Sequence, residues 1–186
     1  MLLLVAERNT LIISRWLVVY EGGIREPMLV KWPGTIQPNS VTGEYVIIED
    51  FYPTILEMAG ITNPKIVQTI DGVSFTSLLK SEDFDSSERP LFWHYPNEWG
   101  PSGPGIGASS AVRLGDWKFI YYHLDQRMEL FNLKSDIGEA YNLVVDNPNK
   151  AKKMAKILSD YLTHVEAQMP TDKETGKIVP MPATLF

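Results

Sequence analysis

The chain has 186 residues, of which 44% are hydrophobic and 22% are charged, and its 17 basic and 23 acidic side chains leave a formal net charge of −6. This composition is typical of a globular protein, and the length suits one domain or slightly more. The acidic balance argues against binding to nucleic acid or to an anionic membrane surface, because both need a basic face. The absence of cysteine excludes disulfides, thiolate metal sites and a cysteine nucleophile.

The first twenty residues contain two apolar runs. Residues 1–6 are followed at once by Glu7 and Arg8, so this run is too short for the apolar part of a signal peptide. Residues 10–20 are rich in Ile, Val, Leu, Trp and Tyr and predict a strand, but they are too few to span a bilayer. We therefore expect no targeting or membrane-spanning segment, and the cellular location stays unknown.

A turn, a strand and two helices are predicted next. Glu21-Gly22-Gly23 predicts a turn, and residues 28–32 predict a short strand. Apolar residues recur at helical spacing between 45 and 59, where Pro53 should begin or kink the helix because proline fits a first turn best. Residues 76–80 predict a short second helix.

The acidic stretch 81–88 is interpreted as a boundary between two structural layers. Beyond it the pattern predicts four strands, at residues 90–95, 110–114, 117–122 and 128–133. Gly115-Asp116 is a two-residue hairpin signal between the second and third of them. The region therefore predicts an antiparallel meander of three or four strands, with a long loop rich in glycine and proline at residues 97–108.

The last regular element is predicted to be an amphipathic helix. Asn147 suits the N-cap and Pro148 the first helical position. One face is lined by six apolar residues: Ala151, Met154, Leu158, Tyr161, Leu162 and Val165. We expect this helix to cover one face of the meander, and we expect residues 171–186 to form an extended tail.

Four segments carry motifs that occur together in one known family. They contain Tyr20-Glu21-Gly22-Gly23, then Asp50-Phe51-Tyr52-Pro53-Thr54, then Asp71-Gly72-Val73-Ser74, and last Arg113-Leu114-Gly115-Asp116-Trp117-Lys118 followed by Glu129-Leu130-Phe131. In this order and spacing they resemble the C-terminal part of type I sulfatases, the arylsulfatase-like enzymes of the alkaline-phosphatase superfamily. The resemblance runs from about residue 20 to near residue 170.

The resemblance implies a protein of two parts, in which a large α/β domain carries the chemistry and a small C-terminal domain completes the substrate cleft. The expected fold is an α/β remnant followed by an α+β subdomain, an antiparallel sheet of three or four strands packed against a long C-terminal helix. Residues 20–82 would be the C-terminal edge of the α/β domain, and residues 88–170 the C-terminal subdomain. Residues 1–19 resemble nothing in the family, and we interpret them as an atypical start, such as that of a truncated or frame-shifted reading frame.

The chemistry that the resemblance implies for a full-length parent has no counterpart in this chain. Such enzymes use a formylglycine made from Cys or Ser in a Cys/Ser-x-Pro-x-Arg motif, together with calcium held by carboxylates. The nearest serine match, Ser102-Gly103-Pro104-Gly105-Ile106, has isoleucine where arginine is needed, and there is no Asp-Asp pair. We therefore expect no catalytic residue, no metal ligand and no cofactor here, and no activity of the chain alone.

Four residues are candidates for contact with a substrate. His94 and Tyr95 end a predicted strand just before the glycine-rich loop, where binding groups often lie, and could contact sugar hydroxyls or sulfate. A histidine held by backbone groups is the alternative. Trp99, in the loop, could stack on a sugar ring. Arg113 would face the cleft or form a surface salt bridge.

Two further groups of residues are predicted to be structural. His123 and His164 have no partners at ligand spacing and are predicted to lie on the surface. Packing between the sheet and the last helix, rather than a binding stripe, is predicted to account for most of four aromatic residues: Trp93, Trp117, Phe119 and Tyr121.

Two functions are consistent with the sequence. The first is the C-terminal fragment of a sulfatase, a sulfuric ester hydrolase acting on glycans, which lacks its nucleophile and metal ligands. The second is a non-catalytic module that binds a glycan, for which a sulfated glycan is the candidate ligand, or another partner. Because residues 1–60 would lack the cover of the missing α/β sheet, we also expect a homo-oligomer formed through them.

Overall fold

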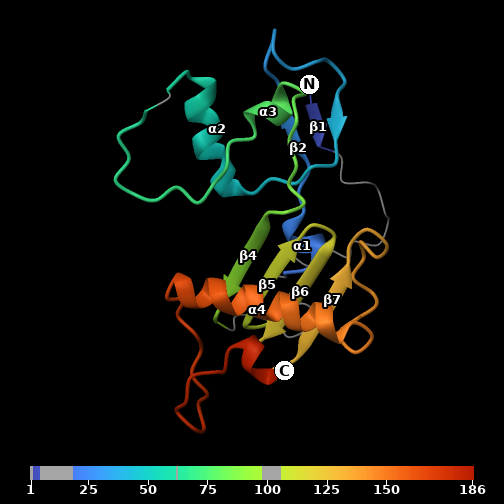
Figure 1. Cartoon of the computed structure of the whole chain (residues 1–186), viewed down its shortest axis with the longest axis vertical. Coiled ribbons are helices and arrows are strands. Elements are labelled where there is room, and N and C mark those ends of the chain that lie inside the picture. Colours follow the sequence, from blue (N-terminus) through green and yellow to red (C-terminus); the bar gives the residue numbers. More distant parts are fainter. Residues whose placement is uncertain (1, 5–18, 62, 98–105) are drawn as a thin grey trace. The chain divides into compact units, whose positions relative to one another are not determined.

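The structure, a computed structural model, describes residues 2–4, 19–61, 63–97 and 106–186 (Figure 1). These residues form two compact units. The N-terminal unit contains residues 26–86 and the first strand, and the sheet unit contains residues 19–25 and 87–186. Most of the strand predicted at 10–20 and most of the loop predicted at 97–108 lie outside the described residues.

The N-terminal unit contains a three-stranded sheet and two helices. Strand β1 (Leu2–Leu4) lies between β2 (Met28–Val30), to which it is antiparallel, and β3 (Val41–Thr42), to which it is parallel. A 3₁₀ turn, η1 (Ile48–Asp50), leads into α2 (Phe51–Met58), and α3 (Thr76–Leu79) follows. Pro53 lies in the first turn of α2, where no intrahelical N–H is required, so it begins the helix and does not kink it.

Buried polar groups join the start of α2 to the loop before α3. Asp50 is fully buried, and its carboxylate accepts hydrogen bonds from the backbone N–H of Ile47 at 2.9 Å and of Val73 at 2.8 Å. The Thr54 hydroxyl donates to the Asp50 carbonyl at 2.6 Å and accepts from the N–H of Phe75 at 3.0 Å. The second and third motifs of the chain therefore bind each other.

Gly72 makes this approach of the two segments possible. A Cβ atom at this position would lie 2.0 Å from the carbonyl oxygen of Glu49. No side chain fits such a distance, so the glycine of the third motif is required by the backbone of the second.

The sheet unit is built on the predicted meander. Strands β4 (Pro90–Tyr95), β5 (Ser109–Leu114), β6 (Trp117–Tyr122) and β7 (Met128–Asn132) are all antiparallel to their neighbours, in the order β4-β5-β6-β7. Leu114 pairs with Trp117 across a two-residue turn in which Gly115 has a φ of +58°, as tight hairpins require. The four-stranded antiparallel sheet with its C-terminal helix is thereby confirmed.

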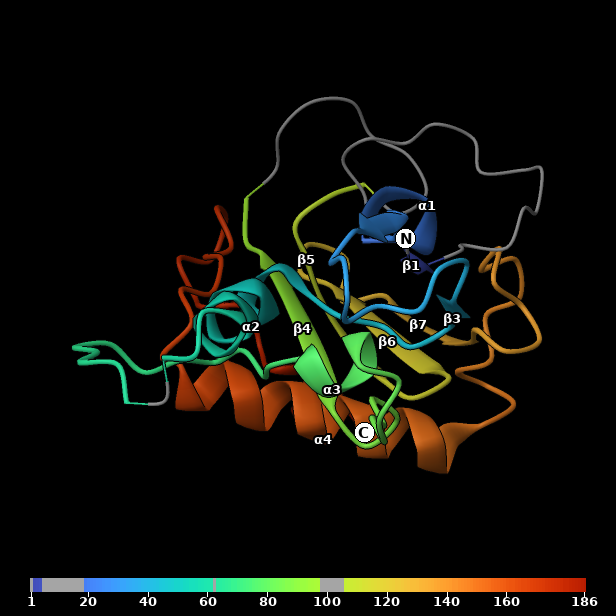
Figure 2. The same ribbon diagram turned by 90° about the horizontal axis from the view of Figure 1, so that it is seen from above.

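Helix α4 (Pro148–His164) covers one face of this sheet (Figure 2). Asn147 and Pro148 occupy the predicted positions at its start, although the Asn147 side chain makes no capping hydrogen bond. The predicted apolar stripe is confirmed for Ala151, Met154, Leu158 and Leu162, which are buried against Val112, Phe119, Tyr121 and Leu130 of the sheet. The last residue of the stripe, Val165, is exposed because it lies just beyond the helix.

The segment after α4 differs from the extended tail that the sequence predicts. Thr171 and Ile178 form a β-bridge, and a 3₁₀ turn, η2 (Pro182–Leu185), lies against α4. Val179 is part of the core beneath the helix. The segment folds back because its apolar residues complete this core.

The opposite face of the sheet has a core of its own. Its buried apolar residues are Val19, Ala111, Ile120, Tyr122, Phe131 and Leu133. Trp93 packs on this face, whereas the other three aromatic residues of the predicted set, Trp117, Phe119 and Tyr121, pack on the helix side. Successive strand residues point to opposite faces, and Phe92, the neighbour of Trp93, takes the helix side, stacked on Tyr161. Within the described part of the chain, no helix has the length and apolar character needed to cross a membrane.

Candidate functional site

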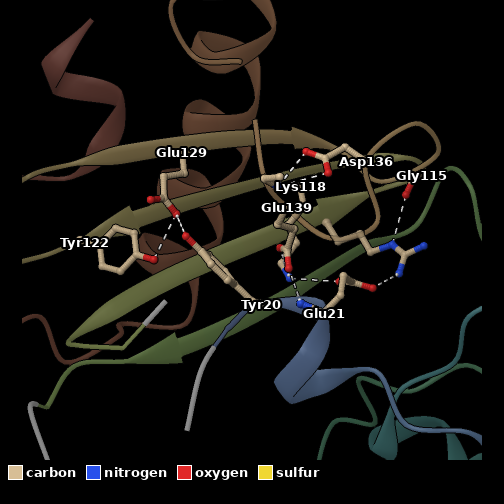
Figure 3. A network of polar contacts seen from close by, with 10 residues as sticks. Tyr20, Glu21, Gly115, Lys118, Tyr122, Glu129, Asp136 and Glu139 are labelled. Carbon is tan, nitrogen blue, oxygen red and sulfur yellow. Dashed lines mark hydrogen bonds and ion pairs between the residues drawn. The ribbon is translucent and has the colours of Figure 1, made fainter. Parts of the chain in front are cut away.

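A cluster of buried charges surrounds Glu21 on the sheet face opposite α4 (Figure 3). Glu21 begins α1 (Glu21–Ile24), a single helical turn, and is 2% exposed. Its carboxylate forms an ion pair with the Lys118 ammonium at 3.0 Å and a second with the Arg113 guanidinium at 3.2 Å. Arg113 and Lys118 are paired residues of β5 and β6, so their side chains project from the same face.

Glu139 completes the cluster from the loop after β7. Its Oε1 forms an ion pair with Lys118 Nζ at 2.8 Å. Its Oε2 accepts a hydrogen bond from the backbone N–H of Glu21 at 2.5 Å. Burial raises the pKa of Glu139, and the charge of Lys118 opposes this rise. Two acids and two bases are thus enclosed together and balance one another.

A second polar group adjoins this cluster and holds Tyr20. The hydroxyls of Tyr20 and Tyr122 both donate to Oε2 of Glu129, at 2.6 and 3.1 Å. Arg127 pairs with the other carboxylate oxygen, and its guanidinium lies 3.7 Å above the centre of the Tyr122 ring. Burial raises the pKa of both tyrosines, so they remain neutral donors at physiological pH.

His94 belongs to a separate group on the α4 side of the sheet. Its Nδ1 lies 2.7 Å from the Ser110 hydroxyl and its Nε2 lies 3.1 Å from the backbone carbonyl of Gln168. Ser110 also contacts Nε2 of His123 at 3.0 Å. Both ring nitrogens of His94 therefore have partners within the protein.

His123 is fully buried, so the prediction that it lies on the surface was wrong. It follows β6 directly, with its ring against Tyr121 and His94, and its backbone N–H bonds to Ala108. Burial lowers the pKa of His123 to about 4, and the neighbouring His94 contributes to this shift. His164 is exposed, as predicted.

The structure does not bring the predicted substrate contacts together. His94 pairs with Ser110 on β5, and Arg113 lies three residues further along that strand, so their side chains project from opposite faces. Arg113 forms an ion pair, but a largely buried one rather than a surface one. Tyr95 follows His94 at the end of β4, and Trp99 lies outside the described residues. The role of all four in substrate binding stays a prediction.

The sequence contained one signal for the buried charges that was overlooked. Lys118, Ile120 and Tyr122 are every second residue of β6. Lys118 therefore shares a face of the sheet with apolar residues. A lysine on such a face is almost never buried without an acidic partner. Its partner Glu21 lies 97 residues before it in sequence, and Glu139 follows on the loop after β7, so no local pattern indicates these pairs.

The arrangement around Glu21 can position a chain segment but offers no group suited to catalysis. Each charge faces an opposite charge inside the protein, and no nucleophile is activated by a neighbouring base. Among the residues that the structure describes, no three His, Asp or Glu side chains are grouped so that they could hold a metal ion.

One known protein family matches most of the chain. The family described as "N-sulphoglucosamine sulphohydrolase, C-terminal" matches residues 14–168. The chain belongs to this sulfatase family. The matched range includes residues 14–19, which lie in the stretch that was expected to resemble nothing in the family.

Similar sulfatases are much longer than this chain. A sulfatase of Formosa agariphila is 41% identical over an alignment 140 residues long, which covers 70% of this chain and 25% of the relative. An N-acetylglucosamine-6-O-sulfatase of Bacteroides thetaiotaomicron is 25% identical over 84% of this chain and 28% of its own length, and bovine arylsulfatase A is 34% identical over 67% and 27%. The chain thus spans about a quarter of the length of these relatives, in their C-terminal portion.

Solved structures share the fold. A protein in complex with its substrate D-glucosamine-2-N,6-O-disulfate has a TM-score of 0.60 at 24% identity, over 80% of this chain and 30% of that one. A second protein, in complex with k-i-k-neocarrahexaose, has a TM-score of 0.60 at 25% identity, over 76% and 29%. The first of these likenesses establishes the fold alone.

Proposed function

We propose that this chain is the C-terminal portion of a sulfatase that hydrolyses sulfate esters of glycans, and that it has no sulfatase activity by itself. The observation that supports this proposal is the structural role of its motifs. The first motif contacts the fourth through Glu21, Arg113 and Lys118, and the second contacts the third through Asp50 and Val73. Motif residues used in this way hold a scaffold together, and the chemistry would come from the part of the longer relatives that this chain does not match.

The nucleophile and the metal ion would belong to that other part. The family implies a formylglycine and a calcium ion, but the described residues contain no group of side chains that fits a metal. We therefore assign no catalytic step to this chain. It would contribute groups that contact the sugar, and His94, Tyr95 and Trp99 are the candidates because they are close together in sequence at the end of β4 and in the loop beyond. Arg113 would act apart from them, since it projects from the other face.

The substrate class is proposed from the name of one relative. The Bacteroides relative is an N-acetylglucosamine-6-O-sulfatase. A sulfated amino sugar is therefore the substrate that we propose for the complete enzyme.

A sulfate-release assay tests the function. The purified chain, with calcium and either an aryl sulfate or glucosamine 6-sulfate, should give no turnover. A fusion of this chain to the N-terminal three quarters of the Formosa sulfatase should release sulfate, whereas those three quarters alone should not. Metal-dependent sulfate release by the unfused chain would contradict the proposal.

A binding module without catalysis is the alternative function. Calorimetric titration of the chain with matched sulfated and unsulfated oligosaccharides distinguishes the two. A fragment that needs its catalytic domain should bind neither ligand, whereas selective binding of the sulfated one would favour the module.

We also propose that the isolated chain self-associates through residues 1–60. Large apolar side chains of the N-terminal unit are more than half exposed: Leu29, Val41, Ile48, Tyr52 and Ile55. Ile48, Tyr52 and Ile55 follow one another at helical spacing and form a single stripe along η1 and α2. An apolar stripe of this kind favours contact with another protein surface.

A further inference from the structure

Two histidines and a serine form a continuous hydrogen-bonded row on the α4 side of the sheet. The Ser110 hydroxyl of β5 lies between Nδ1 of His94 on β4, at 2.7 Å, and Nε2 of His123 after β6, at 3.0 Å. The other nitrogen of His94 lies 3.1 Å from the backbone carbonyl of Gln168, in the segment that follows α4. The row therefore joins the sheet to that segment.

The carbonyl of Gln168 decides where the protons of this row lie. A carbonyl only accepts, so Nε2 of His94 carries a proton, and Nδ1 of the neutral ring accepts from the Ser110 hydroxyl. The hydroxyl has a single proton, so its oxygen accepts from the Nε2–H of His123. Nδ1 of His123 is then unprotonated, and it has no hydrogen-bond partner among the described residues. In this arrangement both rings are neutral.

Acid is incompatible with this arrangement. If both rings were protonated, His94 and His123 would both donate to one serine oxygen, and two positive charges would face each other with ring centres 5.8 Å apart. Burial lowers the pKa of His123 to about 4, His94 adds to this shift, and the backbone of Ser109 opposes it. The closed row therefore resists a proton that a solvated histidine would bind.

Among the described residues, the other groups around His123 supply no counter-charge. The Tyr121 ring packs edge-on against it, and this tyrosine stays neutral because burial and the charge of Asp125 raise its pKa. Asp125 itself is exposed in the turn beyond His123 and is not among the groups that shift the pKa of the histidine. Three further titratable groups lie on α4 or just after it: Tyr161, which is stacked on Phe92, and the exposed His164 and Glu166.

The segment after α4 is attached to the sheet beside this row at a second point. The Tyr121 hydroxyl donates to the carbonyl of Pro180 at 2.9 Å, and the ring of Tyr121 contacts His123. Between the attachments at Gln168 and Pro180, residues 171–178 are exposed. A stretch with so little buried surface can open locally while the rest of the fold stays intact.

We propose that His94, Ser110 and His123 form an acid-sensitive latch, which holds residues 166–181 against the sheet while both rings are neutral and releases them when acid protonates both. Release would bring His123 into contact with water, where its charge is solvated. The core between the sheet and α4 would remain, because it is built mainly from residues of these elements. The latch is independent of the proposed function, since it involves no substrate.

Amide hydrogen exchange of the full chain at pH 7 and pH 4.5 tests the latch. The N–H of Val179, which bonds to the carbonyl of Pro170 at 3.0 Å, reports on the segment. Its protection, corrected for the intrinsic effect of pH on exchange, should fall about 50- to 100-fold, the change expected when closing lowers the pKa of one histidine from 6.5 to about 4. The amides between β5 and β6 should keep their protection.

His123→Gln should abolish this acid effect, because the new side chain does not titrate. His164→Gln, which makes the same change at an exposed position, is the matched control and should behave like the unmodified chain. An equal acid effect in His123→Gln and the unmodified chain would overturn the proposal. Unchanged protection of Val179 in the unmodified chain at pH 4.5 would overturn it too, and so would a parallel loss of protection between β5 and β6.

His94→Ala tests the latch at neutral pH, and it does not depend on the folding of the His123 variant. Loss of the hydrogen bond to Gln168 should lower the protection of Val179 about two- to tenfold at pH 7, the scale of one hydrogen bond. The amides between β5 and β6 should again be unaffected. Unchanged protection of Val179 in His94→Ala would overturn the proposal.

Discussion

Lys118, the second residue of strand β6, carries a fully buried ammonium group. Moving such a charge out of water costs several kcal/mol even after the protein relaxes. The cost is offset because the side chain meets two carboxylates, at 2.8 and 3.0 Å. Burial also disfavours the charged form of Glu139, and its pKa is raised because that carboxylate is poorly solvated.

His123 should make the stability of the fold sensitive to acid. Its pKa is about 4 in the folded chain against an ordinary 6.5, so folding favours the neutral ring. This stabilisation is complete above pH 6.5 and is lost as the pH falls from 6.5 toward 4. The difference corresponds to about 3 kcal/mol in the free energy of unfolding.

Denaturant unfolding between pH 7 and pH 4 measures this effect. His123→Gln should lose less stability over this range than the unmodified chain, and His164→Gln, which changes an exposed histidine, should behave like the unmodified chain. An identical loss in all three would show that another group is responsible.

Gly72→Ala should destabilise the N-terminal unit strongly. The added methyl group would overlap the Glu49 carbonyl at 2.0 Å, so the backbone would have to move and break the contact between Asp50 and Val73. We expect a loss of about 3 kcal/mol or more, as for other severe packing changes. Thermal unfolding checks this against Gly43→Ala, where the new methyl group meets nothing within 4 Å; similar melting of the two variants would contradict the close approach.

At the scale of elements, the outer edge of β7 is protected by the loop that follows it. The Asn142 side chain accepts from the N–H of Leu130 at 3.1 Å and donates to the carbonyl of Met128 at 3.0 Å. The N–H of Leu143 bonds to the Leu130 carbonyl at 2.8 Å. A side chain and one backbone group thus replace a neighbouring strand, which guards the edge against pairing with another chain.

Asn142→Ala should expose this edge. Three hydrogen bonds would be lost, two to β7 and one from the N–H of Val144, which corresponds to about 2–4 kcal/mol of stability. Exchange of the Leu130 amide should accelerate, while amides between β5 and β6 should remain protected. Asn149→Ala, at an exposed position in the first turn of α4, is the control, and equal Leu130 exchange in the two variants would argue against the role of Asn142.

The elements of the sheet unit were predictable because their signals are local. Alternation and the Gly115-Asp116 turn placed all four strands to within a residue, and Asn147-Pro148 placed the start of α4. The folded-back segment around Val179 was missed because its burial depends on α4, and the burial of His123 was missed because it depends on Ser110 and His94 across the sheet. For the candidate site, the sequence predicted Arg113 and His94 as individual residues but not that the sheet places them on opposite faces.

At the scale of the whole molecule, the exposed apolar side chains of the N-terminal unit should drive association. Light scattering of the isolated chain is expected to show a dimer or a larger species. The double substitution Ile48→Glu with Ile55→Glu should shift it toward monomer, because both residues are more than half exposed on one stripe. Val145→Glu, at an exposed position of the sheet unit, should have no effect. A monodisperse monomer for the unmodified chain would contradict this expectation.

The long separation between Glu21 and Glu139 has a consequence for synthesis on the ribosome. The meander and α4 are built from neighbouring segments and can fold as soon as they emerge, whereas the partner of Glu21 follows it by 118 residues. At a synthesis rate of about 5–20 residues per second, Glu139 is made roughly 6–24 seconds after the segment around Tyr20 and Glu21. During that interval its aromatic and charged groups are solvated and accessible to chaperones, so docking of this segment would be among the last steps of folding.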